Sequence, residues 1–562
     1  MATARKGFLL VFTALLVLLV AAGAALATRP SRVLIVVMDQ MRPEYAKQYD
    51  MKNVLRLQNR GVNFPKAWVG QMASETVVSH NTMVSGLFPK HMGWSDEAIR
   101  DLDGSLGYGE NAILEVGALG KADYETLINA RDYPKLGDYL HHKYPDRIVA
   151  NVGQKGYQVE SMAASSSDIW VRMGSKYNTV DLTDPSVVPW TGKYRGPKGN
   201  LPDYIQNDPR FLISSGNVSS PAVGPDDYGT RDTSPAWAYP EDGRYAPGPY
   251  EGHESGDAWV ADAATAIMEN EDWSGLFVTF SNIDKIGHMW GGGPVDNLKN
   301  YTWTPADLTD TIHMPWTAKN ADEQLGKLIA KLKELNQFKD TLIVVTADHG
   351  ETYGGKGWYG KNAYDGGNSS WYAGTWLPGW DSQYVPNVSA GPDALQPLMD
   401  TGKVEFSYQS TAIESWLKMD SRKWSDRLAV ARVMKTLPGV IATYVRSGDR
   451  YTLVSAARSK MNRAERTWWQ AKGQKLVNTM AFSGAADVVG LLADRTLYAA
   501  YGDHGGAQKD VQRIPMAIYA KGIHHQVRST PMRLVDIMPT ILKAMGMRQM
   551  QKMDGRAIGL PL

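Results

Sequence analysis

The feature that most constrains the fold is an apolar strand pattern that recurs along the chain and ends each time at acidic or imidazole side chains. The clearest copy covers residues 341–351, where a β-branched run ends at Asp348-His349-Gly350. Such a run predicts a buried strand, and glycine lets the chain turn at its end. Open α/β sheets carry their sites at that edge. Asp348 and His349 are therefore candidate ligands of a divalent ion, with a turn-forming Asp and a surface His as the alternative.

Three further segments repeat this arrangement. The strand Arg32 to Met38 ends at Asp39, the strand that begins at Leu276 ends at Asp284 with His288 four residues later, and the strand Thr496 to Ala500 leads to Asp503-His504. The spacing of Asp284 and His288 suits two ligands on one face of a helical turn. Each copy alone also has a plain interpretation, such as a turn cap at Asp39.

A hydroxyl group accompanies these strand ends. Thr76 to Ser85 has helical spacing, and Gly86 is a natural C-cap. Thr76 would then lie at the helix N-terminus, where backbone N–H groups and the helix dipole favour an anion. Its hydroxyl could act as a nucleophile, or Thr76 could simply be an N-cap. Lys155 follows the short strand Ile148 to Val152 and could contact an anionic substrate, or could be solvated.

Composition excludes several classes of function. The 562 residues include no cysteine, so disulfides, thiolate metal sites and a cysteine nucleophile are impossible. A net charge of +1 argues against a nucleic-acid-binding surface.

The N-terminus reads as an export signal. An uncharged apolar run from Gly7 to Ala27 follows a basic start and ends in the small-x-small pattern Ala25-Leu26-Ala27. We expect residues 1–27 to be a signal peptide, which would place the protein outside the cytoplasm. The alternative is a retained single-span anchor, and membrane attachment is expected only in that case.

The remainder, residues 28–562, is expected to form one catalytic domain with two irregular insertions. The first covers about 180–254 and is rich in Pro, Gly, Asp and Tyr. The second covers about 352–411 and carries many Trp and Tyr residues among glycines. It could be a lid with aromatic walls over a substrate, or a self-packed surface subdomain.

Together the strand ends offer three carboxylates and three imidazoles, enough for two metal sites. Mixed His and carboxylate ligands without sulfur suit Zn²⁺ better than Ca²⁺ or Mg²⁺. Two ions ~3.5–4 Å apart are suited to in-line displacement at phosphorus.

The ordered set of motifs resembles the alkaline phosphatase superfamily, and within it the type I phosphodiesterase/nucleotide pyrophosphatase branch. The segment from Thr76 to Pro89 resembles that branch's Thr-helix-Thr-Gly-Leu-x-Pro motif, and Asp284-Lys-Ile-Gly-His288 resembles its Asp-x-x-Gly-His motif. The resemblance implies an α/β fold, an alkaline-phosphatase-like three-layer sandwich whose central, mostly parallel sheet has helices on both faces.

The same resemblance implies roles for individual residues. One metal ion is expected on Asp284, His288 and His504. The other is expected on Asp39, Asp348 and His349, with Thr76 as an additional ligand. Thr76 is the implied nucleophile, and a phosphothreonine the implied intermediate, in the hydrolysis of a small phosphoric ester.

The chain departs from this branch after the Thr76 helix. Where phosphodiesterases usually place an Asn, the segment Gly93-Trp-Ser-Asp96-Glu97 offers carboxylates. We expect Asp96 and Glu97 near the substrate, where they would bind a cation or turn away from the phosphoryl group. Lys155 could compensate for them, so phosphomonoesters and phosphodiesters both remain possible substrates.

The sequence disfavours three alternatives: a sulfatase, a phosphomutase and a non-catalytic descendant. A sulfatase needs a Cys or Ser in a Cys/Ser-x-Pro-x-Arg context, which does not occur at Thr76. A phosphomutase would use the same metals, but export argues against it. A non-catalytic descendant is disfavoured by the complete ligand set.

Overall fold

The computed structural model describes residues 29–115, 126–128, 131–163, 166–172, 202–211, 255–290, 313–353, 357–358, 372–374, 395–498 and 502–561. For a few of these, including His288 and Tyr353, only the backbone is described. The expected signal segment 1–27 and most of both expected insertions lie outside these ranges, so their predicted roles stay predictions.

The larger of two main sheets has eight strands in the order β20-β2-β19-β8-β1-β7-β5-β6. Its centre is β1 (Arg32–Met38), which pairs in parallel with β8 (Thr341–Thr346) on one side and β7 (Trp273–Phe280) on the other. Beyond β7 follow β5 (Ile148–Gly153) and β6 (Ile169–Arg172), also parallel.

The opposite edge of this sheet contains its antiparallel strand. There β19 (Met516–Tyr519) runs antiparallel to β8 and to β2 (Val62–Asn63), and β20 (Gln526–Val527) is parallel to β2. The described sheet is therefore mostly parallel, as the sequence predicted.

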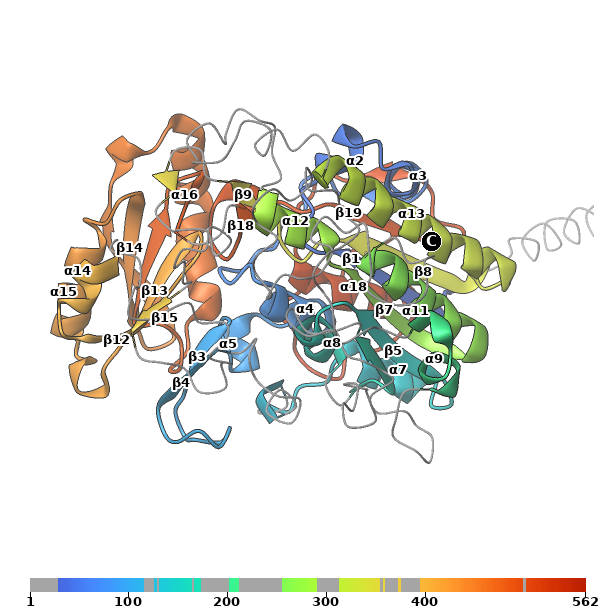
Figure 1. Cartoon of the computed structure of the whole chain (residues 1–562), viewed down its shortest axis with the longest axis horizontal. Helices are drawn as coiled ribbons and strands as arrows, with labels where there is room; N and C mark the ends of the chain where they lie inside the picture. The colour runs from blue at the N-terminus through green and yellow to red at the C-terminus, as the bar shows by residue number, and fades with distance from the viewer. Residues whose placement is uncertain are drawn as a thin grey trace, which may run out of the picture.

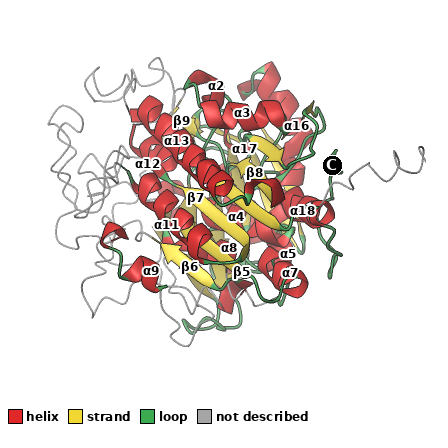
Figure 2. Ribbon diagram, turned by 90° about the vertical axis from the view of Figure 1, so that its right-hand side faces the viewer, coloured by secondary structure: helices red, strands yellow, loops and turns green. Residues whose placement is uncertain are grey.

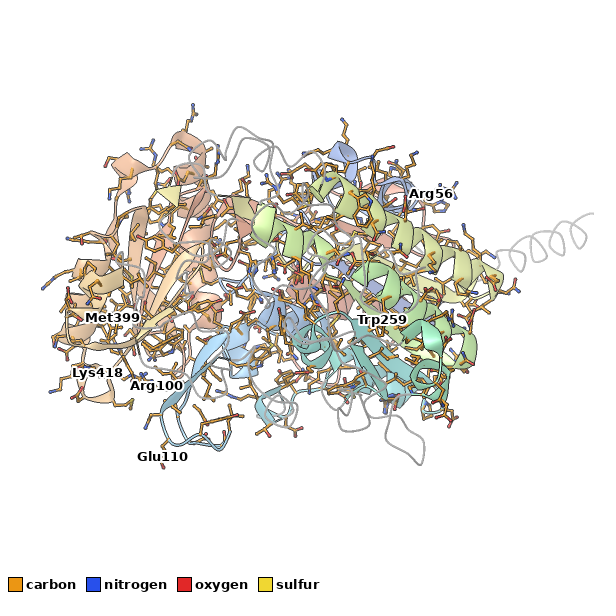
Figure 3. The ribbon with its side chains drawn as sticks, in the orientation of Figure 1. Arg56, Arg100, Glu110, Trp259, Met399 and Lys418 are labelled. Carbon is orange, nitrogen blue, oxygen red and sulfur yellow. The ribbon has the colours of Figure 1, made fainter. Side chains whose placement is uncertain are left out.

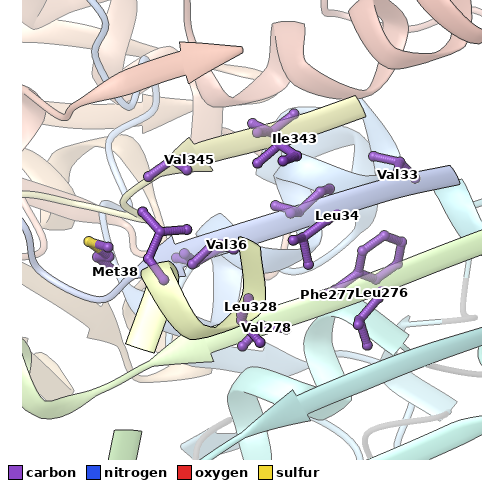
Figure 4. Close-up of a cluster of buried hydrophobic side chains, with 14 of the residues drawn as sticks. Val33, Leu34, Val36, Met38, Leu276, Phe277, Val278, Leu328, Ile343 and Val345 are labelled. Carbon is purple, nitrogen blue, oxygen red and sulfur yellow. The ribbon is translucent and has the colours of Figure 1, made fainter. Parts of the chain in front are cut away.

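Both faces of the central strands are buried. Residues Val33 to Met38 alternate between the two faces of β1, and all are 0% exposed. Figure 4 shows side chains of β1, β7 and β8 packed together with Leu328 of a covering helix. A strand that is apolar at every position requires such two-sided cover, which explains why the apolar runs do not alternate with polar residues.

Helices provide that cover in two groups. One contains α3 (Lys52–Arg60), α11 (Gly256–Asn270), α12 (Asn282–Trp290) and α13 (His313–Glu334). The other contains α4 (Thr76–Ser85), α7 (Leu136–Lys143), α8 (Gly156–Ala163) and α18 (Ile537–Met545). Figure 2 shows α11, α12 and α13 along one side of the strands and α7 and α18 on the other. This confirms the predicted α/β class.

A second, antiparallel sheet forms a separate part of the molecule, drawn in orange in Figure 1. Its order is β11-β12-β13-β16-β14-β15. The strands are β11 (Tyr372–Gly374), β12 (Val404–Gln409), β13 (Ala412–Leu417), β14 (Val440–Ser447), β15 (Arg450–Ala456) and β16 (Val488–Leu492). Helices α15 (Trp424–Met434) and α16 (Arg463–Val477) pack on it. The sequence analysis did not anticipate this sheet.

A short hairpin connects the region after α4 to this second sheet. It consists of β3 (Ala98–Asp101) and β4 (Ala112–Glu115). Arg100, labelled in Figure 3, donates to the Leu417 carbonyl at 2.7 Å and pairs with Glu405 at 2.9 Å. These contacts hold the start of the hairpin against β13. Among the described helices, none is long and apolar enough to cross a membrane.

Candidate active site

Three carboxylates meet at one edge of the large sheet because the strands that precede them are neighbours. Asp39 follows β1 and Asp348 follows β8, while Asp284 lies in the first turn of α12, directly after β7. The parallel register brings the ends of β1, β7 and β8 together. All three carboxylates are buried, as the recurring strand pattern predicted.

Two sets of these side chains could hold a metal ion. Asp39, Asp348 and His349 form one set, and Asp284, His349 and His504 form the other. Within each set the ligand atoms lie within 4.8 Å of one another. The shared imidazole nitrogen, His349 Nε2, lies 3.4 Å from Asp39 Oδ1 and 3.5 Å from Asp348 Oδ2.

The electrostatics of the first set fit a cation. Asp39 Oδ1 and Asp348 Oδ2 are buried and accept no hydrogen bond from the described residues. Burial, followed by repulsion from Asp284 and Asp348, raises the pKa of Asp39 well above its ordinary value. Burial likewise raises the pKa of Asp348 to about 6. Carboxylates crowded in this way are costly unless a cation or a proton neutralises them, and the mixed oxygen and nitrogen donors suit zinc.

His504 reaches the same edge from a distant part of the chain. The short strand β18 (Gly502–Asp503) pairs with β9 (Thr352–Tyr353), which follows Asp348-His349 closely. As a result the His504 ring stacks on the His349 ring at 3.7 Å, and its Nε2 lies 3.6 Å from Asp284 Oδ1. The backbone of His288 lies in α12, but its side chain is outside the described part, so its ligand role stays a prediction.

Thr76 lies beside both sets. It is the first residue of α4, is 2% exposed, and its Oγ1 is 3.1 Å from His349 Nε2. The free N–H groups of the first turn of a helix favour an anion there. His80, one turn later, contacts the Thr76 carbonyl through Nδ1 at 2.6 Å and Thr279 Oγ1 through Nε2 at 3.0 Å. These contacts attach the start of α4 to the end of β7.

Lys155 brings a positive charge into the cluster. Its Nζ donates to Asp39 Oδ2 at 2.7 Å and forms a shorter contact with the Asp284 carboxylate. Although burial works to lower the pKa of Lys155, the carboxylates of Asp284 and Asp39 raise it overall. Gln158, on the following helix α8, also donates to Asp39 Oδ2. The ammonium group therefore lies between the carboxylates of Asp39 and Asp284.

Asp96 and Glu97 lie in a second acidic cluster, next to this one. Asp96 is 1% exposed, its Oδ1 accepts from the Glu97 backbone N–H at 2.7 Å, and it contacts the carboxyl of Glu414 on β13. Tyr408 donates to Glu97 Oε2 at 3.4 Å. Burial raises the pKa of Asp96 to about 7. A role of Asp96 and Glu97 in substrate binding stays a prediction.

The sequence analysis missed Glu75, which also borders Thr76. Its Oε2 lies 2.6 Å from His504 Nδ1. Glu75 feels the charges of Glu97, Asp96, Asp503 and Glu414, so it belongs to the same acidic cluster. A signal was available: an acidic residue directly before the candidate nucleophile of a buried helix is unusual, because buried carboxylates need a partner.

Comparisons with known proteins concern the family and the fold of the chain. A family model described as type I phosphodiesterase/nucleotide pyrophosphatase matches residues 33–355, and a sulfatase model matches residues 316–406. No curated protein sequence matches the chain.

Solved structures resemble the fold at low sequence identity. Wild-type alkaline phosphatase PafA is 14% identical, with a TM-score of 0.54 over 92% of this chain and 96% of that one. A four-substitution variant of PafA gives 13% identity and a TM-score of 0.55 over the same shares. Human ectonucleotide pyrophosphatase/phosphodiesterase 5 is 12% identical, with a TM-score of 0.49 over 93% of this chain and 97% of that one.

Proposed function

Because the chain belongs to the type I phosphodiesterase/nucleotide pyrophosphatase family, within the alkaline phosphatase superfamily, we propose that it is an exported phosphoric ester hydrolase that works through a phosphothreonine on Thr76. One observation carries the proposal. Thr76 Oγ1 lies at a helix N-terminus, 3.1 Å from Nε2 of His349, the residue that both candidate metal sets share. The N-cap of α4 is Glu75, so Thr76 is the first helical residue rather than the cap, and its hydroxyl can serve as the nucleophile.

We propose that two divalent metal ions of the zinc type occupy the site. Asp39, Asp348 and His349 would hold one ion, and Asp284, His288 and His504 the other. When bound, such ions lower the pKa of a nearby hydroxyl and offset the negative charge of the phosphoryl group.

The chain's own residues then perform the displacement. The backbone N–H groups at the start of α4 and the Lys155 ammonium bind phosphoryl oxygens and orient the phosphorus over Thr76. Thr76 Oγ1 gives its proton to solvent and bonds to phosphorus while the bond to the leaving oxygen breaks, and the leaving oxygen takes up a proton from solvent. Water then attacks phosphorus from the side that the leaving oxygen vacated and gives a proton to solvent. The bond between phosphorus and Thr76 Oγ1 breaks, the phosphoryl product leaves, and Thr76 Oγ1 regains a proton.

The nucleophile is tested by replacing Thr76. We expect Thr76→Ala to lower turnover of an aryl phosphate by on the order of 10³-fold or more, because the covalent step needs the hydroxyl. Thr82→Ala is the matched control: Thr82 lies in the same helix, and its hydroxyl bonds Gln71 at 2.7 Å, away from the candidate metal ligands. Thr82→Ala should retain turnover. Equal turnover in Thr76→Ala and wild type would exclude Thr76 as nucleophile.

The ester class is tested on one preparation with p-nitrophenyl phosphate, bis-p-nitrophenyl phosphate and p-nitrophenyl sulfate. We expect the phosphate esters to be cleaved faster than the sulfate, because Thr76 cannot supply the modified Cys or Ser of a sulfatase. The ratio of the two phosphate rates ranks monoester against diester. A faster sulfate rate would favour the activity named by the second matching family model.

Export rests on the apolar N-terminal run from Gly7 to Ala27. Mass spectrometry of protein recovered from outside the cytoplasm should find a mature N-terminus close to Thr28. An intact N-terminus on membrane-bound protein would instead identify the retained anchor.

A further inference from the structure

A carboxylate that the proposed reaction does not use lies directly behind one of its candidate metal ligands. Glu75 is 0% exposed and His504 is 7% exposed. Glu75 Oε2 lies 2.6 Å from His504 Nδ1, while the other ring nitrogen, Nε2, lies 3.6 Å from Asp284 Oδ1. The Glu75–His504 pair lies within ion-pair distance but does not meet the criteria for a hydrogen bond. The two ring nitrogens therefore face different partners.

The backbone around this pair is built to accommodate it. Gly505, directly after His504, has φ +89, and a Cβ there would lie 1.6 Å from Glu75 Oε1. The Gly505 N–H donates to the Ser74 carbonyl at 3.1 Å, and the Gly506 N–H donates to Ser74 Oγ at 2.9 Å. Ser74, directly before Glu75, is thus bonded to Gly505 and Gly506, directly after His504. A glycine is required at position 505 because any side chain there would collide with the Glu75 carboxylate.

The second sheet supports the same loop from the other side. Ser410 Oγ and Thr411 Oγ1, between β12 and β13, donate to the His504 carbonyl at 2.6 and 2.9 Å. The peptide of His504 is therefore fixed, and the remaining freedom of its imidazole is rotation about the side-chain bonds. A contact at Nδ1 removes that freedom.

We propose that Glu75 is a positioning residue that holds His504 with its proton on Nδ1 and its Nε2 lone pair directed at the metal site. This inference rests on the proposed function. A histidine that binds a metal through one nitrogen commonly donates its other N–H to a carboxylate, which fixes the tautomer and the ring orientation. Because Glu75 directly precedes Thr76, the same residue links the nucleophile to a metal ligand.

The test measures how fast matched variants release bound zinc. Wild type, Glu75→Gln and Glu75→Ala are each loaded with two equivalents of zinc. The release of each equivalent to a colorimetric chelator is then followed over time. We expect Glu75→Ala to lose one equivalent about 10- to 100-fold faster than wild type, and Glu75→Gln to lie between them because its amide oxygen still accepts from Nδ1. The second equivalent should be released at the wild-type rate.

Glu414→Gln is the matched control, since Glu414 is a buried carboxylate of the same cluster whose contact is with Asp96. Glu414→Gln should release both equivalents of zinc at the wild-type rate, and only the Glu75 variants should speed the release of one equivalent. Wild-type release rates in both Glu75 variants would overturn the inference alone. A wild-type protein that binds no zinc would overturn the proposed function and this inference with it.

Discussion

Asp96 illustrates, at the scale of one residue, how a carboxyl group can be held near the site without facing solvent. The hairpin that begins two residues later is fixed to β13 by Arg100. This contact explains why Asp96 lies against Glu414 of the same strand. Asp96 and Glu97 stand where the resemblance leads us to expect an Asn. The carboxyl group of Asp96 contacts that of Glu414 instead of facing solvent.

The raised pKa of Asp96 predicts a pH-dependent stability. Burial raises this pKa to about 7, so the folded chain binds a proton that the unfolded chain releases above about pH 4, and stability falls as pH rises from about 4 to about 7. Asp96→Asn removes this penalty, and we expect a gain on the order of 2–4 kcal/mol above pH 7. Urea unfolding across this pH range measures it. Asp103→Asn, on the exposed turn of the same hairpin, should follow the wild-type curve.

Residue identities at the site were more predictable than their contacts. Asp39, Asp348 and His349 were identifiable because each directly follows a buried strand, and adjacency in sequence fixes their place at the sheet edge. Glu75 could be noticed only by its place directly before Thr76; its contact could not be predicted, since its partner His504 comes from the far end of the chain. No local periodicity reports such a contact; it depends on how the Ser74 and Gly505 backbones meet.

Elements with one strong local pattern were predicted nearly to the residue. β1 begins and ends where its apolar run does, and α4 ends at Gly86, which has the left-handed φ of 68. The second sheet was not predicted, because its strands are separated by helices and pair through tertiary contacts. The expected insertion 352–411 accordingly includes β12, which is a regular strand of that sheet.

Within the second sheet, one carboxylate holds several elements together. Asp487, just before β16, is 0% exposed and lies 2.8 Å from Arg446 on β14, 2.9 Å from Arg427 on α15 and 3.2 Å from Arg422. It also accepts from the Leu417 N–H of β13 at 3.1 Å. Three guanidinium groups on one buried oxygen make this aspartate the common partner of β13, β14, α15 and the loop that carries Arg422.

We expect Asp487→Asn to destabilise the protein by about 3–5 kcal/mol, because buried guanidinium groups lose their counter-charge. Urea unfolding followed by tryptophan fluorescence measures the change. Glu334→Gln is the control: its pair with Lys331 is exposed, with 64% of the Glu334 side chain accessible, and should cost less than about 1 kcal/mol. Equal losses in the two variants would contradict a structural role for the Asp487 network.

At the scale of the whole molecule, the site lies where the two sheets meet. The large sheet has one continuous apolar core, and the antiparallel sheet has its own clusters. Figure 1 shows β9 and β18 between these two parts. The large sheet supplies Asp39, Asp284 and Asp348, while Ser410 and Thr411 of the second part fix His504. Completion of the site therefore requires both parts to be folded.

Removing metal ions should consequently change the stability of the entire chain. Without them, burial raises the pKa of Asp39 and raises that of Asp348 to about 6. The folded state then retains protons that the unfolded state releases, so the stability of chelated protein falls as pH rises from about 4 through about 6. With ions bound, their charge replaces those protons, and the imidazole ligands are held without a proton that the unfolded chain binds, so stability in that range should rise with pH. At a thousandfold excess of ion over Kd the stabilisation is about 4 kcal/mol.

Thermal unfolding of zinc-loaded and chelated protein between about pH 4 and about pH 8 measures the difference in stability between the two forms. This difference should widen with pH because only the chelated form contains uncompensated buried carboxylates. Two coincident curves would mean that the folded site holds no ion.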